Sequence, residues 1–484
     1  MAHIGKSFQL GVWGLAVCWA LSSAQGQPQD IAAHAKAAQE AQRTGDFATA
    51  IKEYTILSQL EPEVAEVYSN LGIAYYFHRQ PEEAVQAFAK ALQLKPNLVS
   101  ALIFSGLAYY DLSNTAQALR ALQQAVALAP TDPLAQTWLG FSYLAASQYD
   151  EAVEHFLAAS KLQPDNPDIW YGLGHAYMEI GQREIQKLAQ IAPDGARFWE
   201  LAGDQWRLRG DLGKTEVFYR EALRRRPNLQ EARQSLNEVI SRKGKPADLP
   251  PLSATSTSPS EQELAADQHY FRSRDCEQRA QAAFEKIGAI APGSYRAHQV
   301  LAESLTAQQR FDEAIVEYQK VLQLKPGLST IHMAIGDLFM RQGRASQAVK
   351  EYKAELRARP KAPPVLFRLG HAWLVLGDDQ QAEKTLQEAL ACQADIPEIQ
   401  RDLGKIYLRQ HRYAQGIAAL EAYARTRPED ASAHFLLMKA YKSVGDDVAA
   451  NRQQRLFEKY SEDAKRRTQA QQAVQYFEQQ REAP

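Results

Sequence analysis

The sequence has 484 residues, of which 45% are apolar and 23% are charged, as is ordinary for a folded soluble protein. One globular core of this length would be over-long, so the chain must divide into domains or stack repeated units. The 55 basic and 57 acidic residues leave a formal net charge of −2. This balance excludes the global basic field that favours nucleic acid or an anionic membrane.

The chain opens with a segment typical of an exported protein. After a weakly basic start, an uncharged apolar run covers 10–21 and small residues follow over 22–24. We expect a signal peptide over 1–24, and hence a periplasmic or secreted protein without an integral membrane span after cleavage. The alternative is a buried helix or an uncleaved anchor, although the run is short for a bilayer. Residues 15–18 resemble a lipoprotein cleavage box, but Val17 is bulky where a small residue is expected.

A period of 34 residues begins near Ile31. Prolines mark it at Pro62, Pro96, Pro130 and Pro164. Between the first two prolines stand Tyr68, Leu71, Gly72, Tyr75, Ala84, Phe88 and Ala91. Between the last two stand Leu139, Gly140, Tyr143, Ala152, Phe156 and Ala159. This pattern predicts a helix–turn–helix unit in which small residues let two helices approach closely and proline ends the second helix.

The first array is predicted over 31–240, with about six repeats. Its fifth unit begins at Trp170 and has lost about five residues, because Pro193 arrives early, so a short second helix is expected around 183–191. The sixth unit, 196–229, restores the phase. Proline, serine and threonine then dominate 241–262, which predicts a flexible linker.

The second array is predicted over 263–464, again with about six repeats. Its first unit, 263–294, is irregular. Five full units follow, and Leu322–Pro326 repeats Leu92–Pro96 letter for letter. A helix with one apolar stripe is expected to cap the array over 465–484. Because Cys276 and Cys392 lie several repeats apart, we expect both thiols to be unpaired.

These units resemble tetratricopeptide repeats over roughly 31–464. The resemblance implies an all-α solenoid, a right-handed superhelix, here in two arrays joined by a Pro/Ser/Thr-rich linker. It also implies that the first helix of each repeat lines a concave groove. Mapped residue by residue, the groove positions of the first array are Tyr76, Phe77, Ile103, Leu107, Tyr110, Phe141, Leu144 and Tyr171. Those of the second array form a basic strip of Arg401, Lys405, Arg409, Lys439 and Lys442.

Both strips have a structural alternative. Tyrosines at helical spacing are often packing residues, and charge runs are usually solvated faces. An apolar groove would suit a helix or an extended peptide, and a basic strip would suit an acidic tail or a terminal carboxylate. His175 and His371 share a groove-facing position, where a role in recognition competes with simple solvation.

Signals for chemistry are weak. Gly210–Thr215 looks like a phosphate loop, but its first glycine is missing and no strand precedes it. The sequence has no paired-cysteine metal motif and no glycine-flanked serine elbow. We therefore predict a protein that is not an enzyme, has no cofactor or metal, does not bind nucleic acid, and acts as a scaffold or adaptor for protein or peptide partners. The alternatives are an accessory subunit of a cell-envelope enzyme or secretion complex, or an enzyme with an unrecognised site.

Overall fold

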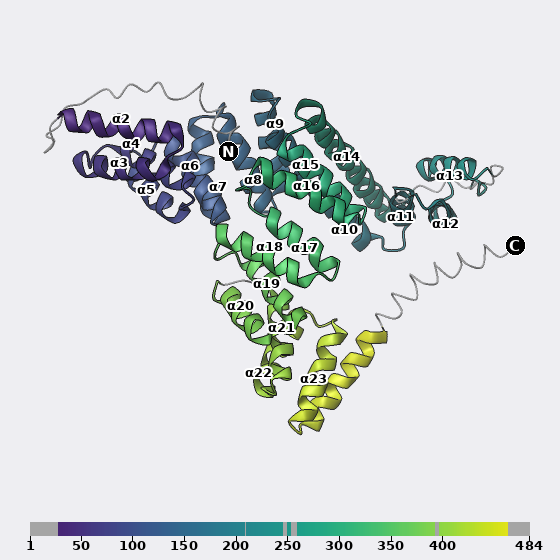
Figure 1. Cartoon of the computed structure of the whole chain (residues 1–484). Helices are drawn as coiled ribbons and strands as arrows, with labels where there is room; N and C mark the ends of the chain where they lie inside the picture. The colour runs from purple at the N-terminus through teal and green to yellow at the C-terminus, as the bar shows by residue number, and fades with distance from the viewer. Residues whose placement is uncertain (1–27, 209, 245–248, 253–258, 393–395, 463–484) are drawn as a thin grey trace. The chain divides into compact units, whose positions relative to one another are not determined.

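The computed structural model describes residues 28–208, 210–244, 249–252, 259–392 and 396–462, and it places no strand in these ranges. In chain order (Figure 1) the helices are α2 (Pro28–Thr44), α3 (Phe47–Leu60), α4 (Ala65–Phe77), α5 (Pro81–Leu94), α6 (Val99–Asp111), α7 (Thr115–Leu128), α8 (Pro133–Ala145), α9 (Tyr149–Leu162), α10 (Pro167–Ile191), α11 (Ala196–Leu208), α12 (Leu212–Arg225), α13 (Gln230–Arg242), α14 (Glu261–Ile290), α15 (Tyr295–Ala307), α16 (Phe311–Leu324), α17 (Ile331–Arg341), α18 (Ala345–Ala358), α19 (Pro363–Leu376), α20 (Asp379–Ala391), α21 (Pro397–Arg409), α22 (Tyr413–Thr426) and α23 (Ala431–Ser443). A further helix covers 447–462. The predicted all-α class is confirmed.

Most repeats are helix pairs that close over one small residue. A Cβ atom added to Gly72 would lie 2.6 Å from the Phe88 ring, and one added to Gly140 would lie 2.9 Å from Phe156. The same relation joins Gly106 to Leu122, Gly203 to Tyr219, Gly336 to Tyr352, Gly370 to Leu386 and Gly404 to Leu420. Real Cβ atoms do not approach this closely, so the glycines set how near the two helices come.

The ends of the helices follow from the turn residues. Between the two helices of a repeat one residue has a positive φ, and this residue recurs every 34 positions as Gly45, Arg79, Ser113 and Ser147. At the other end, the residue before each repeat proline leaves the helical region, as Lys95 does with φ −139° and ψ 89°. This conformation is expected because proline disfavours helix in the residue before it.

The fifth repeat departs from the sequence prediction. No turn occurs and no separate short helix forms around 183–191, because α10 is one unbroken helix. Gly181 stands 34 residues after Ser147, where the other repeats turn, yet it lies inside α10 without a positive φ. The reason is that α14 packs along this stretch: a Cβ on Gly181 would lie 3.5 Å from the Cβ of Cys276.

The far end of α14 completes the fifth repeat. A Cβ on Gly174 would lie 2.5 Å from the Phe284 ring, the same relation that Gly140 has to Phe156. In an uninterrupted repeat this partner would be Gln190, which is 94 positions before Phe284. The period then resumes in phase, with Ala302 at the next small position. A stretch of 94 residues therefore interrupts the fifth repeat.

The contacts between residues divide the chain accordingly. Unit 1 contains the described residues up to Tyr177 together with Ala280–Leu369. Unit 2 contains Met178–Arg279 together with the described residues from Gly370 onward. The unit boundaries fall inside α10, α14 and α19, so the compact units do not coincide with the predicted arrays, 31–240 and 263–464. We call residues 178–279 the insertion.

The insertion has a helix pair and a core of its own. α11 and α12 close over Gly203, and α13 covers a cluster that includes Tyr219, Leu236 and Ile240, each at most 1% exposed. Leu249 packs against this cluster, and Arg233 Nη1 donates to the carbonyl of Pro250 at 2.8 Å. Within the predicted linker, 241–262, the first two residues belong to α13 and the last two to α14, and the described segment 249–252 is held against α13 at Leu249 and Pro250.

The predicted signal peptide, 1–24, and the predicted cap, 465–484, lie outside the described residues. Cys276 and Cys392 are free thiols, as expected from their separation. A search of the described helices for one of sufficient length and apolarity to cross a bilayer finds none.

Candidate functional site

The eight predicted groove residues all lie on first helices of repeats. They are Tyr76 and Phe77 on α4, Ile103, Leu107 and Tyr110 on α6, Phe141 and Leu144 on α8, and Tyr171 on α10. Ile103 and Leu107 are each 4% exposed and Phe141 is 8% exposed, so these three belong to the core of the repeats. The other five are half-buried.

Aromatic side chains contact one another in clusters on these first helices. The ring of Tyr110 meets Trp138 edge to face at 5.4 Å, and Tyr76 meets Phe104 at 6.1 Å. We call the surface around Tyr76, Tyr110, Trp138 and Tyr171 the inner face. Tyrosine and tryptophan offer a large apolar area and a polar tip, which suits contact with another segment of chain.

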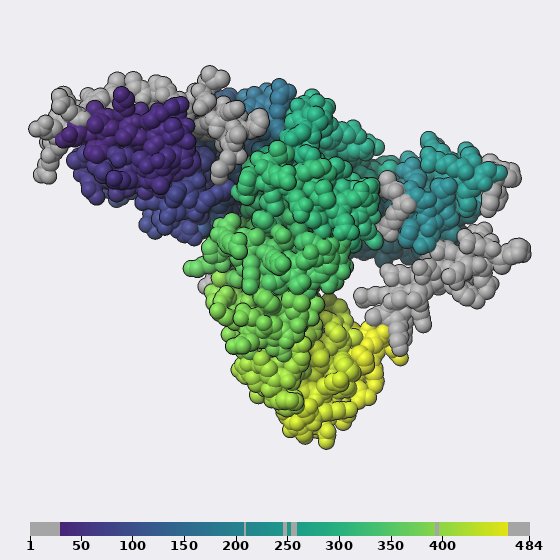
Figure 2. Space-filling view, in the orientation of Figure 1, coloured from purple at the N-terminus to yellow at the C-terminus, as the bar shows by residue number. Residues whose placement is uncertain are grey.

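A later part of unit 1 contacts this inner face across a long sequence separation. Arg79, at the turn after α4, donates from Nη2 to the carbonyl of Gly327 at 3.1 Å. Arg359, at the end of α18, donates from Nη2 to the hydroxyl of Ser113 at 2.9 Å. Figure 2 shows that the green surface of α15–α18 meets the blue surface of the first repeats. The inner face is thus partly covered by the chain itself.

Asp111 is the acidic group at the centre of this contact. Burial raises the pKa of its carboxyl above the ordinary value, against the lowering influence of Arg79, a hydrogen bond from Tyr76, and Arg359. Burial also raises the pKa of Tyr76 well above its ordinary value, and Asp111 adds to the effect. Both shifts have the same cause, because the later helices exclude water from this part of the inner face.

A second polar cluster joins α10 to α15. Arg296 donates from Nε to Asp168 at 2.6 Å and from Nη1 to Gln299 at 2.8 Å. Its guanidinium lies 4.0 Å from the centre of the Tyr171 ring, and Tyr295 donates its hydroxyl hydrogen to Asp168. Burial opposes the charge of Asp168, but Arg296 holds the pKa of that carboxyl below its ordinary value.

Tyr171 and His175 both meet Glu303. The Tyr171 hydroxyl donates to Glu303 Oε1 at 2.8 Å, and Nε2 of His175 lies 3.1 Å from Glu303 Oε2. His371 has a carboxylate partner as well, since its Nδ1 lies 2.7 Å from Asp402. Each of the two histidines that share a groove position therefore faces an acid from the neighbouring repeat.

The predicted basic strip lies in unit 2, and acidic groups neutralise part of it. Arg401 and Lys405 both contact the buried Asp402, at 3.0 and 3.5 Å, and Arg409 pairs with Asp379. Lys439 lies 4.8 Å from the centre of the Phe435 ring, and Lys442 is exposed. Binding of an acidic tail to this strip stays a prediction.

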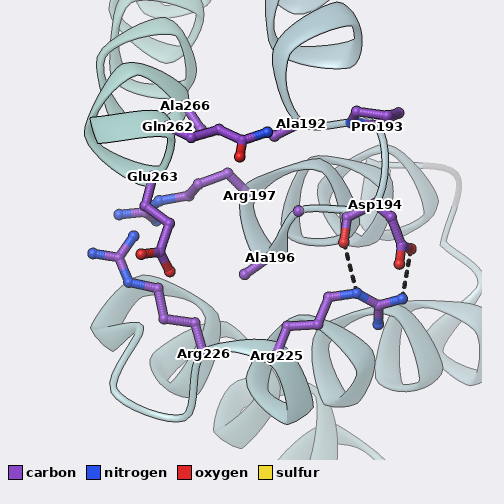
Figure 3. Close-up of a pocket in the computed structure, with 11 residues that line it drawn as sticks. Ala192, Pro193, Asp194, Ala196, Arg197, Arg225, Arg226, Gln262, Glu263 and Ala266 are labelled. Carbon is purple, nitrogen blue, oxygen red and sulfur yellow. Dashed lines mark hydrogen bonds and ion pairs between the residues drawn. The ribbon is translucent and has the colours of Figure 1, made fainter. Parts of the chain in front are cut away.

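A pocket of about 360 Å³ lies in the insertion, between the α10–α11 turn, the end of α12 and the start of α14 (Figure 3). Arginines line it, but carboxylates already pair with them: Arg225 contacts Asp194 at 2.6 Å and Arg226 contacts Asp267 at 2.8 Å. Because these charges are matched within the insertion, we assign no ligand to the pocket.

Comparison with protein families agrees with this architecture. Models described as TPR repeat match 106–147, 142–181 and 302–343, and models described as tetratricopeptide repeat match 65–98, 333–397 and 401–441. Together these segments cover about half of the chain. The chain is a tetratricopeptide repeat protein. The matches stop at residue 181 and resume at 302, so they leave out most of the insertion.

Solved structures with similar folds are other repeat proteins. MamA 41-end from Desulfovibrio magneticus RS-1 is 25% identical over 31% of this chain and 85% of that chain, with a TM-score of 0.30. YrrB, titled a TPR protein with an unusual peptide-binding site, is 17% identical over 39% and 98%, with a TM-score of 0.33. The Cut9–Hcn1 structure is 14% identical over 89% and 93%, with a TM-score of 0.34. No curated protein matched the chain.

The sequence did not indicate several charged residues that lie beside the inner face. It placed tyrosines on the inner face but gave no role to Arg79, Asp111, Asp168 or Arg296. Their partners lie up to 248 positions away, and a repeat pattern carries no record of such contacts. The described residues contain no group of three or more histidine, cysteine, aspartate or glutamate side chains arranged to hold a metal ion.

Proposed function

We propose that this tetratricopeptide repeat protein is a non-catalytic scaffold that binds peptide segments of partner proteins on the inner faces of its repeats. One contact carries the proposal: Arg79 binds the carbonyl oxygen of Gly327 at 3.1 Å. Every residue carries a backbone carbonyl, and Arg79 reaches this one over a glycine, where no side chain intervenes. The same donor can therefore hold a segment of another protein.

The half-buried aromatic side chains supply the second support. Tyr76, Tyr110 and Tyr171 combine apolar area with a hydroxyl, and such residues are enriched in protein interfaces. Helices that are already stacked need little ordering when a partner binds, which keeps the entropic cost of association low.

A comparison of one double variant with a single-substitution control tests the proposal. We expect Tyr76→Ser with Tyr110→Ser to remove most partners from a quantitative pull-down with the full chain. The control is Tyr143→Ser, which also truncates a half-buried tyrosine. Tyr143 stacks on His155 at 5.3 Å and bonds Gln123, so it faces the second helices. Equal loss of partners with both variants, or loss with neither, would remove the inner face as the binding surface.

We also propose that the protein is exported and works in the periplasm or outside the cell. The support is the apolar run over 10–21 with small residues over 22–24. In this setting the runner-up function is that of an accessory subunit in a cell-envelope complex. N-terminal sequencing of the protein purified from its own host tests the export signal: a new terminus close to residue 25 is expected, and an intact terminus would contradict cleavage.

A further inference from the structure

The loop between α16 and α17 differs from its sequence twin. Leu322–Pro326 repeats Leu92–Pro96, so the two loops would be expected to match. The earlier loop leads into α6 at Val99, but α17 starts at Ile331, two residues later than the period predicts, after Thr330 in a left-handed conformation with φ 77°. The first turn of α17 is thus replaced by irregular chain.

The altered loop is shaped to receive Arg79. Gly327 occupies the position that Asn97 has in the earlier loop. A Cβ atom at Gly327 would overlap the guanidinium of Arg79, whose Nη2 approaches the glycine most closely and donates to its carbonyl. A side chain at this position would therefore force the guanidinium of Arg79 to move away, whereas the loop backbone itself has no left-handed φ at Gly327 that calls for glycine.

The charges on the two sides of this contact are complementary. The first repeats present Asp111 beside Tyr76 and Tyr110, whereas the later segment brings Lys325 and Arg359. Arg79 has the largest lowering effect on the pKa of the Asp111 carboxyl, and Arg359 and Lys325 add to it, while the Lys325 ammonium itself donates to the Tyr295 hydroxyl at 2.7 Å. A carboxylate next to tyrosine rings suits a lysine or arginine side chain, which gains both charge pairing and contact with the ring face.

We propose that Tyr76, Arg79, Tyr110 and Asp111 form a docking site for an extended, basic peptide segment, and that the loop 325–330 with Arg359 occupies this site as an internal ligand. Arg79 holds the backbone of the segment, and Asp111 with the two tyrosines selects a lysine or arginine. The inference rests on the proposed function and names the partner class: a partner segment that carries a basic residue displaces the loop.

Displacement is energetically feasible because the rim of the contact is weak. The hydrogen bonds of Arg79 and Arg359 are both exposed, and such bonds contribute little net stability because water can replace either partner. An internal ligand reduces the apparent affinity for an external one by the fraction of molecules that are open. Opening the loop should therefore strengthen peptide binding without any new contact.

The test uses the full chain and a labelled peptide that copies residues 322–332. Gly327→Ala with Arg359→Ala releases the internal loop, and fluorescence anisotropy measures the peptide. We expect the opened chain to bind the peptide at least about tenfold more tightly than the unaltered chain. Addition of Asp111→Asn should remove that gain, and so should a peptide in which the lysine copied from Lys325 is glutamate.

The control for surface charge is Arg310→Ala. Arg310 is an exposed arginine whose contacts, with Glu313 and Gln308, stay within its own turn, so its loss should change nothing. Hydrogen exchange at 78–80 and 112–114 reports separately whether the loop has opened. Equal binding to opened and unaltered chains, or binding that ignores Asp111, overturns the inference. The pull-down with Tyr76→Ser and Tyr110→Ser tests the proposed function independently of this peptide assay.

Discussion

Two buried arginines occupy the same local position in the two units and have different surroundings. Arg296 in unit 1 and Arg197 in unit 2 each stand four residues after the proline that ends a long helix, on the first turn of the next helix. Among the described residues Arg296 has one carboxylate partner, Asp168 at 2.6 Å. Arg197 has three, at 2.6 Å from Glu200, 2.6 Å from Asp267 and 3.2 Å from Glu231.

The local sequence sets where the arginine lies, but helices from elsewhere in the chain decide what it does. Arg197 is the counter-charge for a cluster of acids in the insertion, so its role is to hold that cluster together. Arg296 has a single acid and lies over the Tyr171 ring, on the surface that we propose for partners. The same motif therefore supplies a structural centre in one unit and part of the proposed recognition surface in the other.

The largest expected effect is from Arg197→Met. Loss of this arginine leaves Glu200, which is 1% exposed, as a buried charge without its closest partner. Removal of one member of a buried ion pair costs about 3–5 kcal/mol. We therefore expect hydrogen exchange in α11 and the first half of α14 to rise steeply, because exchange reports the free energy of local opening.

The matched variant is Arg296→Met. Asp168 would keep the hydroxyl of Tyr295 and the charge of Lys325, so we expect a smaller loss, about 1–3 kcal/mol, seen in α10 and α15. If the two variants lose the same free energy of local opening, the number of acidic partners does not distinguish the two arginines. That result would contradict the different roles assigned to them.

The two clusters should also respond to pH with opposite sign. Burial raises the pKa of Glu200 above its ordinary 4.5, even with Arg197 beside it. The folded insertion then binds a proton more readily than the unfolded chain, so this group adds stability as pH falls through the raised pKa toward 4.5. The pKa of Asp168 lies below its ordinary 3.8, so its contribution is present above 3.8 and is lost as pH falls through the lowered value.

Calorimetry of the full chain between about pH 3 and pH 7 checks these signs. The quantity to compare is the difference in melting temperature between the unaltered chain and Glu200→Gln, and separately Asp168→Asn. The Glu200 difference should change between neutral pH and about 4.5, and the Asp168 difference only below about 3.8. Parallel curves for the two substitutions would show that both acids have the same electrostatic role.

Two glycines of α10 have different surroundings: Gly174 packs within the fifth repeat, and Gly181 packs within the insertion. Gly174→Ala would place a Cβ 2.5 Å from the Phe284 ring, and overpacking of this kind costs about 1–3 kcal/mol. Gly181→Ala meets its nearest neighbours at 3.5 Å, an ordinary contact, inside a continuous helix. There alanine should be neutral or stabilising by up to about 1 kcal/mol.

Thermal unfolding of the two variants decides between two architectures. If α10 turned at Gly181, as the repeat period alone predicts, alanine would be strained there and Gly181→Ala would destabilise the protein. A neutral or raised melting temperature supports the unbroken helix and the interruption of the fifth repeat. A loss as large as that of Gly174→Ala would contradict both.

Most of the fold could be predicted because each repeat has local signals. Gly72 and Phe88 are 16 residues apart, and Pro96 ends the second helix, so one repeat can be recognised without reference to any other. The fifth repeat could not be recognised in this way. Its glycine, Gly174, meets Phe284, which is 110 positions away, and the intervening stretch contains a helix pair with the same period. The dipeptide Ala-Pro occurs at 192–193 and again at 291–292, and each copy looks in the sequence like the end of a shortened repeat.

The candidate site was predictable only in part, for the same reason. Tyr76 and Tyr110 follow from their place in the repeat, and the structure puts both on the inner face. Phe141 follows from the same rule but is buried, because the ring packs edge to face against Phe156 at 5.0 Å. Arg79 stands at a turn position where other repeats have glycine, serine, glutamine or histidine, and no local pattern indicates that Gly327 receives it.

The smallest expected effect concerns the turns between paired helices. Unit 1 uses Ser147 at this turn with φ 59°, whereas the insertion uses Gly210 with φ 77°. A left-handed conformation costs a residue with a side chain about 1–2 kcal/mol, and glycine escapes this cost. Ser147→Gly should therefore stabilise unit 1 slightly, and Gly210→Ser should destabilise the insertion by a similar amount, about 1 kcal/mol, in local hydrogen exchange. Effects of the same sign would mean that contacts of the side chain, rather than the backbone conformation, determine stability at these turns.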